Sequence, residues 1–166
     1  LEMAQLVRAR IDALELSVDF GWMDASYTEY KTLDPTGTVA IDASNTPYVY
    51  VPEWKYAIHG RYHLPEFGNV GAFTVSVDYS DQAELYNDAN PNPQYYDKVR
   101  SIENLEAAIT WNNMLGREGL SARLFGSNLT DNHWASSQLA AYRSLGLWGQ
   151  YPAPPRAWGV TLRYEF

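Results

Sequence analysis

Two histidines have the spacing of a possible metal site. His59 and His63 are four residues apart, with Arg61 between them. On a helix this spacing brings two imidazoles together, but on a strand it separates them by ~13 Å. The surrounding residues alternate between apolar and polar, which indicates a strand. The pattern therefore predicts no metal site here.

Two further stretches partly match known functional motifs, but each lacks residues that its motif requires. Residues 88–92, Asp-Ala-Asn-Pro-Asn, match the first half of an EF-hand calcium loop. Pro93 then stands where the motif needs glycine, and Val99 stands where it needs glutamate. Gly126-Ser127-Asn128 lacks the second glycine of a nucleophile elbow. We predict no catalytic residue, no metal ligand and no cofactor.

The carboxylates allow two interpretations. Asp19, Asp78 and Glu106 could pair for acid–base catalysis, but polar side chains that line a water-filled interior explain them more simply. Glu15 could form a cross-strand ion pair with Lys55 or with Arg61, because opposite charges on adjacent strands attract. If these side chains line a water-filled interior, the sequence predicts a set of lumen-facing residues: Glu15, Asp19, Lys55, His59, Arg61, Asp78, Glu106, Arg123 and Arg163.

These residues need strands to position them, and the last ten residues are the clearest example. Residues 157–166 alternate without a break. Their apolar positions are Trp158, Val160, Leu162, Tyr164 and Phe166. About ten residues is the length of a tilted strand that crosses a bilayer. In a membrane barrel the apolar side faces lipid and the polar side faces a wet lumen.

The same alternation predicts seven strands in all. Their expected bounds are 1–9, 14–30, 54–64, 71–86, 102–113, 120–128 and 157–166. The connections are alternately short (10–13, 65–69 and 114–119) and long (31–53, 87–100 and 130–156). Antiparallel neighbours would then place every short turn at one end and every long loop at the other, as in transmembrane barrels. Soluble sandwiches mix loop lengths at both ends.

The composition agrees with this class. No run of 18 apolar residues exists, which excludes membrane helices. Aromatic residues make up 14% of the chain, and tyrosine and tryptophan suit membrane interfaces and ligand surfaces. The net charge of -8 argues against a nucleic-acid partner.

Several short stretches resemble the C-terminal end of a TonB-dependent outer-membrane receptor. Asn128-Leu129-Thr130-Asp131 is similar to the family's "NLTD" motif, and Pro155-Arg156 is similar to its "PR" before the last strand. Residues 163–166, Arg-Tyr-Glu-Phe, resemble the terminal "xYxF". Residues 20–27 resemble its "GYxDAxY" stretch. Glu53 departs from the basic or small residue that the family more often has.

The resemblance implies an all-β, antiparallel up-and-down transmembrane barrel of about 22 strands around a plug. This chain would be the seven C-terminal strands, with residues 1–166 as one barrel segment and with the plug and N-terminal strands absent. The implied function is TonB-energised uptake of a ferric siderophore, a corrinoid or a glycan across a Gram-negative outer membrane, without enzyme activity. The implied partners are outer-membrane lipid, the barrel-assembly machinery, and TonB through the missing N-terminal part.

The resemblance also assigns roles to aromatic residues. Phe166, with Tyr164 and Leu162, would be the signal that the assembly machinery reads. The aromatics of the long loops would face a small-molecule or glycan ligand: Tyr48, Tyr50, Tyr95, Tyr96, Trp134, Tyr142, Trp148 and Tyr151. Loop packing is the alternative explanation for them.

Two other functions fit the same pattern. One is a free-standing small outer-membrane barrel with a structural or adhesive role, against which the odd strand number argues. The other is a soluble β-sandwich binding module with a single dry core.

Overall fold

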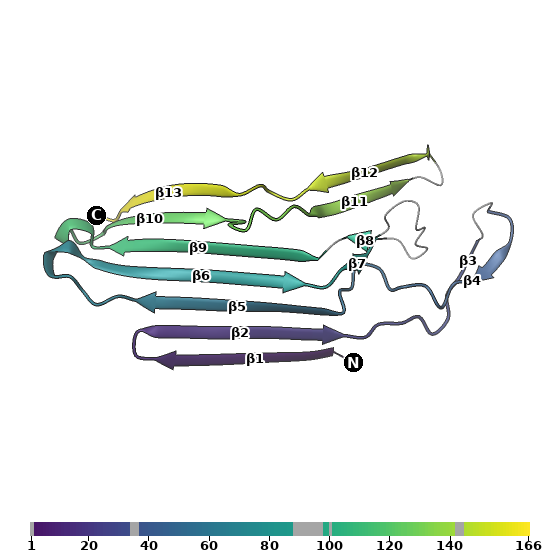
Figure 1. Ribbon diagram of the computed structural model, residues 1–166, viewed down its shortest axis with the longest axis horizontal. Helices are drawn as coiled ribbons and strands as arrows, with labels where there is room; N and C mark the ends of the chain where they lie inside the picture. The colour runs from purple at the N-terminus through teal and green to yellow at the C-terminus, as the bar shows by residue number, and fades with distance from the viewer. Residues whose placement is uncertain (1, 34–36, 88–97, 100, 142–144) are drawn as a thin grey trace.

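The computed structural model describes residues 2–33, 37–87, 98–99, 101–141 and 145–166, and its main feature is one antiparallel sheet (Figure 1). Seven strands form this sheet in the spatial order β1-β2-β5-β6-β9-β10-β13. Their bounds are Glu2–Ile11, Leu14–Met23, Trp54–His63, Ala72–Gln82, Ile102–Asn112, Leu120–Ser127 and Ala157–Tyr164. Each of them pairs with the next one along the chain, which confirms the predicted up-and-down order.

Two predicted strands are too long. The strand expected over 14–30 ends at Met23, and the strand expected over 71–86 ends at Gln82. The Met23 N–H donates to the Glu53 carbonyl at 2.8 Å, and after this bond the chain leaves the partner strand. Tyr27 then stacks on Tyr30, with ring centroids 4.8 Å apart. The apolar–polar alternation continues beyond Met23, but the described residues there have no neighbouring strand of the large sheet to pair with.

The long connections contain small hairpins, which sequence analysis did not predict. β3 (Lys31–Leu33) pairs with β4 (Ala40–Asp42), and β7 (Leu85–Tyr86) pairs with β8 (Lys98–Val99). The third hairpin joins β11 (Ala135–Ala141) to β12 (Leu147–Pro152). All three lie at the same end of the sheet in Figure 1. The short turns lie at the other end.

The short turns are compact. Asp12 and Ala13 alone join β1 to β2, and Asp12 has a positive φ of 49°. Two 3-10 helices, η1 (Gly68–Val70) and η3 (Met114–Gly116), occupy the other two turns. In the described part of the chain, no helix has both the length and the apolar character needed to span a membrane.

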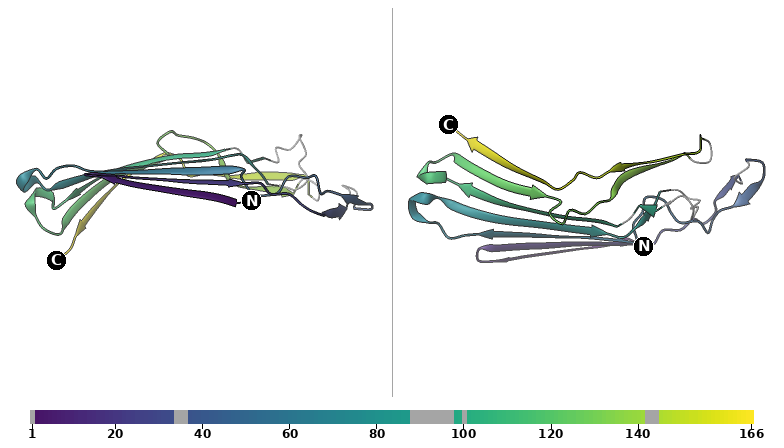
Figure 2. Two further views of the ribbon diagram at one scale, coloured as in Figure 1. Left: turned by 90° about the horizontal axis from the view of Figure 1, so that it is seen from below. Right: turned by 45° about the horizontal axis from the view of Figure 1, so that its top comes forward.

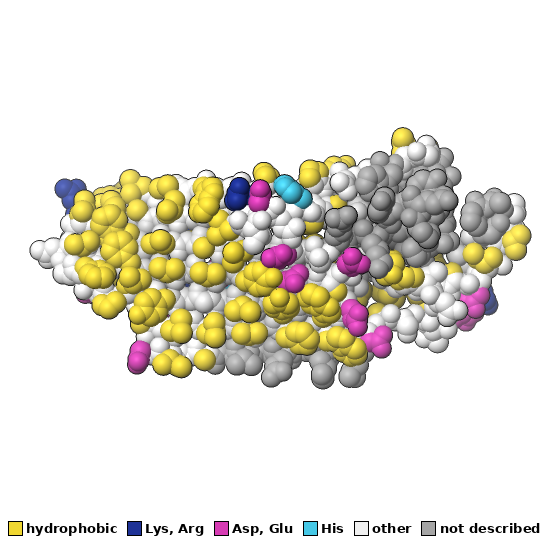
Figure 3. Space-filling view, viewed as in Figure 1, with side chains coloured by type: hydrophobic (Ala, Val, Ile, Leu, Met, Phe, Trp, Pro, Cys, Tyr) yellow, Lys and Arg dark blue, Asp and Glu magenta, His cyan; other side chains and the backbone are white. Residues whose placement is uncertain are grey.

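The sheet is a single layer (Figure 2). The alternation of side chains along its strands gives it one apolar and one polar face. The buried hydrophobic residues among the described side chains are three alanines: Ala43, Ala108 and Ala135. Large apolar side chains such as Val160 and Leu162 are 74% and 67% exposed. Hydrophobic side chains cover one face along the strands, and acidic side chains gather on it toward the loop end (Figure 3). This face needs an apolar environment that the described chain does not supply.

Aromatic residues border the apolar face at two levels. Tyr56 and Tyr62 on β5 are six residues apart, as are Phe73 and Tyr79 on β6 and Trp158 and Tyr164 on β13. Six residues of strand span ~20 Å. Ring contacts join neighbours within each level, between Tyr56 and Tyr79 at 5.9 Å and between Phe73 and Trp111 at 5.3 Å. The spacing matches the apolar band, about 25 Å tall, between the aromatic girdles of membrane barrels.

A large apolar side chain, that of Phe125, lies on the polar face. Its cross-strand partner is Gly159, and a Cβ on that glycine would lie 2.4 Å from the Phe125 ring. On the apolar face the arrangement is reversed, with Trp158 opposite Gly126. A ring over a glycine covers backbone that has no side chain of its own. The pairing explains why two glycines are tolerated inside adjacent strands.

Candidate functional site: the polar face and the loop-end rim

The register places all nine predicted lumen-facing residues on the polar face. Glu15 lies opposite Arg61, and His59 lies between Ser17 and Asp78. Asp78 is also opposite Glu106 on β9. The others on this face are Asp19, Lys55, Arg123 and Arg163. One sheet therefore presents a continuous polar surface across six strands.

Glu15 is the centre of a small ionic cluster near the short turns. Its carboxylate lies 3.7 Å from the guanidinium groups of Arg10 and Arg61 and 3.7 Å from the imidazole of His63. Of the two ion pairs left open by the sequence, the register selects the one with Arg61, because Lys55 lies opposite Gly21. The Glu15 side chain is 35% exposed, so each pair is screened and stabilises the fold by about 1 kcal/mol at most.

A second cluster surrounds His59. Its Nδ1 lies 2.8 Å from an Asp78 oxygen, and its Nε2 lies 3.6 Å from an Asp19 oxygen. Both clusters border a hollow of about 550 Å³ on this face. Among the described residues, no group of three histidine, cysteine or acidic side chains could hold a metal ion. The hollow therefore offers charged groups and hydrogen-bonding groups on one face of the sheet.

Ordered loops form the rim at the other end of the strands. The Tyr50 N–H donates to the Tyr86 carbonyl at 2.8 Å, and the Ala83 N–H donates to the Trp54 carbonyl at 2.9 Å. Tyr27 stacks on Tyr48 with ring centroids 4.7 Å apart. These contacts join three segments that are far apart in the sequence. They fix the first long loop against the start of the second.

Side-chain hydrogen bonds hold the end of the β3–β4 hairpin in place. The Ser44 N–H and hydroxyl donate to the Asp42 carboxylate at 2.9 and 2.6 Å. These two hydrogen bonds lower the pKa of Asp42, because they stabilise its charged form. The Ser44 hydroxyl oxygen also accepts a bond from the Tyr30 N–H at 2.8 Å. The loop after β2 is therefore tied to the hairpin.

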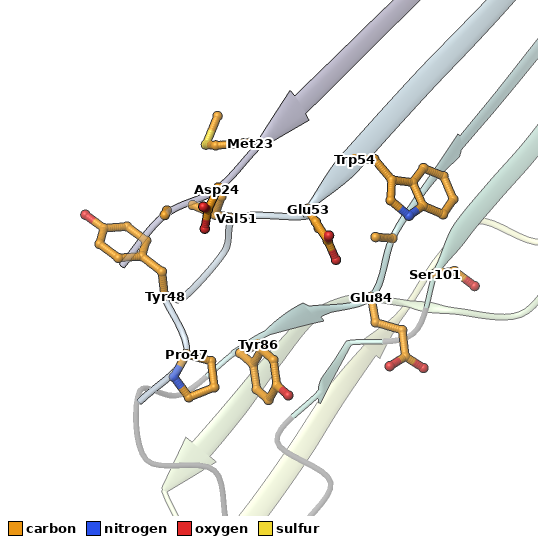
Figure 4. A pocket seen from close by; sticks show the side chains of 12 residues that line it. Met23, Asp24, Pro47, Tyr48, Val51, Glu53, Trp54, Glu84, Tyr86 and Ser101 are labelled. Atoms are coloured by element: carbon orange, nitrogen blue, oxygen red, sulfur yellow. The ribbon is translucent and has the colours of Figure 1, made fainter. Parts of the chain in front are cut away.

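A cavity of about 600 Å³ lies within this rim (Figure 4). Its wall combines aromatic and acidic side chains from three segments. Among the described residues that line it, none is a lysine, an arginine or a histidine. The acidic and aromatic residues that line it are Asp24, Tyr48, Glu53, Trp54, Glu84 and Tyr86. We call this cavity the rim pocket. Carboxylates accept hydrogen bonds, and aromatic rings offer flat apolar surface, so the pocket suits a ligand that donates hydrogen bonds.

The predicted ligand-facing aromatics have different positions. Tyr48 lines the rim pocket, whereas Tyr50 is 58% exposed and donates its hydroxyl to Asn87. Trp134 and Tyr151 belong to the third long connection, where Tyr151 is 65% exposed on β12. The backbone of Trp148 also lies on β12. Tyr95, Tyr96 and Tyr142 lie outside the described residues.

Sequence reasoning missed most of the rim pocket. It selected loop tyrosines and left out three carboxylates, Asp24, Glu53 and Glu84. Glu53 did have a signal, since it departs from the residue type that the family usually has there. The other two have no sequence signal, because only the folded loops bring them beside Tyr48 and Tyr86.

Of the comparisons with known proteins, the one with solved structures identifies the fold. No protein-family model matches the sequence, and no curated protein does either. Among solved structures, the chain resembles the ferric yersiniabactin uptake receptor FyuA from Yersinia pestis, with a TM-score of 0.75 and 10% sequence identity. The match covers 99% of this chain and 23% of the receptor chain. The sheet therefore has the fold of the matching part of that receptor, seven antiparallel strands of a larger β-barrel.

Proposed function

We propose that this chain is the C-terminal barrel segment of a TonB-dependent outer-membrane receptor that takes up a scarce nutrient. The likeness to FyuA over 99% of the chain carries the proposal. The order of the short motifs supports it independently. The "NLTD" and "PR" residues lie at the two ends of the third long connection, and the terminal "xYxF" residues begin within β13 and continue past its end at Tyr164.

The lipid environment follows from the exposed face. A soluble sandwich needs a second sheet to cover its inner side chains. The described residues form one layer, and the apolar side chains between the two aromatic levels face outward. A bilayer supplies the missing apolar environment. A free-standing small barrel would need β1 to pair with β13, and these two strands are the unpaired edges of the described sheet.

The functional surface is then the rim. The rim pocket and the β11–β12 hairpin lie at the loop end, which we place at the cell exterior. The ligand is a ferric siderophore, a corrinoid or a glycan, and the acidic lining of the pocket favours one that donates hydrogen bonds. The polar face lines the lumen. TonB acts through parts of the receptor beyond this segment, and the receptor itself is not an enzyme.

Cysteine labelling of intact cells tests this orientation. The sequence contains no cysteine, so single cysteines in this segment are unambiguous. In the full receptor, cysteines at Asn45 and Gln150, both exposed at the loop end, should react with a membrane-impermeant thiol reagent. Cysteines at Glu66 and Glu118, exposed in the short turns, should react only after the cells are opened. Labelling of the short turns alone would invert the topology and remove the rim from the ligand's path.

Deletion of Phe166 tests the proposed assembly signal. Phe166 is fully exposed, and its ring contacts only the Tyr164 ring among the described aromatic pairs, at 6.2 Å. The deletion should therefore reduce the amount of folded receptor in cells much more than the stability of receptor that has already folded. Heat-modifiable gel mobility measures the first quantity, and unfolding in lipid measures the second. Phe166→Leu should separate the roles, since simple interface anchoring tolerates leucine. Equal losses in both measurements would leave only the anchoring role.

A further inference from the structure

The β11–β12 hairpin is joined to the barrel wall by two short segments. It forms its own two-stranded sheet and shares no strand pairing with the seven-stranded sheet in the described residues. Residues 128–134 lead into it, and residues 153–156 lead back to β13. Beyond these segments, the hairpin also lies near β8. Its direction over the rim therefore depends on what holds the two segments together.

Asn128 bonds to both segments at once. Its Nδ2 donates to the Asn132 carbonyl at 2.9 Å and to the Pro154 carbonyl at 3.2 Å. Its Oδ1 accepts a bond from the Asn132 N–H at 2.9 Å. Asn128 is 3% exposed and is the one buried polar residue among the side chains whose burial is described. All its polar side-chain atoms are paired, as burial requires.

Neighbouring contacts strengthen the junction. Arg156 lies 3.5 Å from the Asp131 carboxylate, and the Ala153 N–H donates to the Trp134 carbonyl at 2.9 Å. The Leu129 N–H donates to the Leu105 carbonyl of β9 at 2.9 Å, which fastens the junction to the wall. We call Asn128, Asp131 and Arg156 the clamp.

The residue type at position 128 follows from the geometry. Its φ is +47°, in the left-handed region that asparagine tolerates better than most residues. The site also needs two donated bonds and one accepted bond from one short side chain, and only a carboxamide supplies that set without a charge. Aspartate would keep the acceptor and lose the donor. Glycine would keep the backbone conformation and lose all three bonds.

We propose that the clamp is a positioning device that sets the direction of the β11–β12 hairpin over the receptor mouth, with Asn128 as its central residue. Its value for ligand capture rests on the proposed function, since Tyr151 lies on this hairpin and Trp134 lies directly before it. The positioning itself needs no ligand. It can therefore be measured separately from transport.

The test is a distance measurement between two spin labels in the full receptor, purified in detergent. One label is placed at Gln150 on β12, and the other at Glu118 in a short turn of the wall. Asn128→Gly should at least double the width of the distance distribution, and Asn128→Asp should give an intermediate width. Arg156→Gln, which removes the ion pair alone, should cause a smaller broadening.

Asn113→Gly is the matched control. Asn113 has nearly the same φ, +49°, but lies in a short turn and makes no capping side-chain bond. This variant should leave the distribution unchanged. If Asn128→Gly does not fold, Arg156→Gln decides the question alone. Distributions identical to the parent in the folded clamp variants would overturn the proposal. A broadened distribution in a receptor whose loop end labels from inside would keep the clamp and reject the proposed function.

Discussion

Leu124→Arg should destabilise the barrel by roughly 2–4 kcal/mol, because it places a charge near the middle of the lipid-facing band. Leu124 is 48% exposed on the apolar face and lies opposite Val160 and Ile109. It is two residues from Gly126, the partner of Trp158 at one aromatic level, and four from Leu120, the partner of Tyr164 at the other. The measurement is unfolding of the full receptor in lipid.

Arg123→Leu is the reciprocal control on the same strand. Arg123 lies on the polar face, with its guanidinium carbon 5.8 Å from the centre of the Phe125 ring. Its loss removes an exposed cation–π contact of about 0.5–1 kcal/mol. The cost should therefore be clearly smaller than that of Leu124→Arg. Equal costs at these adjacent positions would contradict the assignment of the two faces.

Gly71→Ala should destabilise the β5–β6 turn by about 3 kcal/mol or more. The φ of Gly71 is +106° with ψ at -167°, a conformation that is essentially restricted to glycine and costs other residues 1–3 kcal/mol. A Cβ at this position would also lie 2.3 Å from the Asn112 carbonyl oxygen and 2.5 Å from that of Asn113. Both contacts are with backbone, which cannot move aside without disturbing the next turn.

Gly68→Ala in the same turn isolates the steric part of this effect. Gly68 also has a positive φ, +55°, but a Cβ there would meet nothing within 4 Å. Its substitution should cost only about 1–2 kcal/mol, the conformational term. Unfolding of both variants under the same conditions gives the comparison. If Gly71→Ala lowered the free energy of unfolding no more than Gly68→Ala does, Gly71 would not lie as close to the backbone of the neighbouring turn as the structure places it.

The seven long strands could be predicted because alternation is a local property of the chain. β13 shows this most clearly, since Trp158, Val160 and Leu162 fall on one face in the sequence and in the structure. The polar-face residues were also predictable, because a period of two assigns them without any knowledge of neighbours. Their partners were not, since the choice between Lys55 and Arg61 for Glu15 depends on the register.

Strand ends and the rim depended on contacts that no local pattern contains. The alternation continues past Met23, but pairing stops there because β5 begins at Trp54. The β3–β4 and β11–β12 hairpins lie in segments rich in residues that punctuate structure, which predicted loops, and β7 lies in the part of the predicted strand 71–86 that leaves the sheet. The rim pocket joins Asp24, Glu53 and Glu84 through backbone bonds between distant segments. The resemblance to the "NLTD" motif singles out Asn128, but its physical role depends on its bond to the distant Pro154 carbonyl, which no local pattern predicts.

The central claim is that the apolar face of this sheet lies in lipid while the opposite face is wet. Spin labels placed one at a time at positions 74–78 of β6 in the full receptor, reconstituted in bilayers, test this claim most directly. Positions 75 and 77 should be accessible to oxygen, which concentrates in lipid. Positions 74, 76 and 78 should be accessible to a water-soluble nickel complex instead. Alternation with a period of two is the expected result, and equal accessibility to the nickel complex on both faces would contradict a membrane-spanning barrel wall.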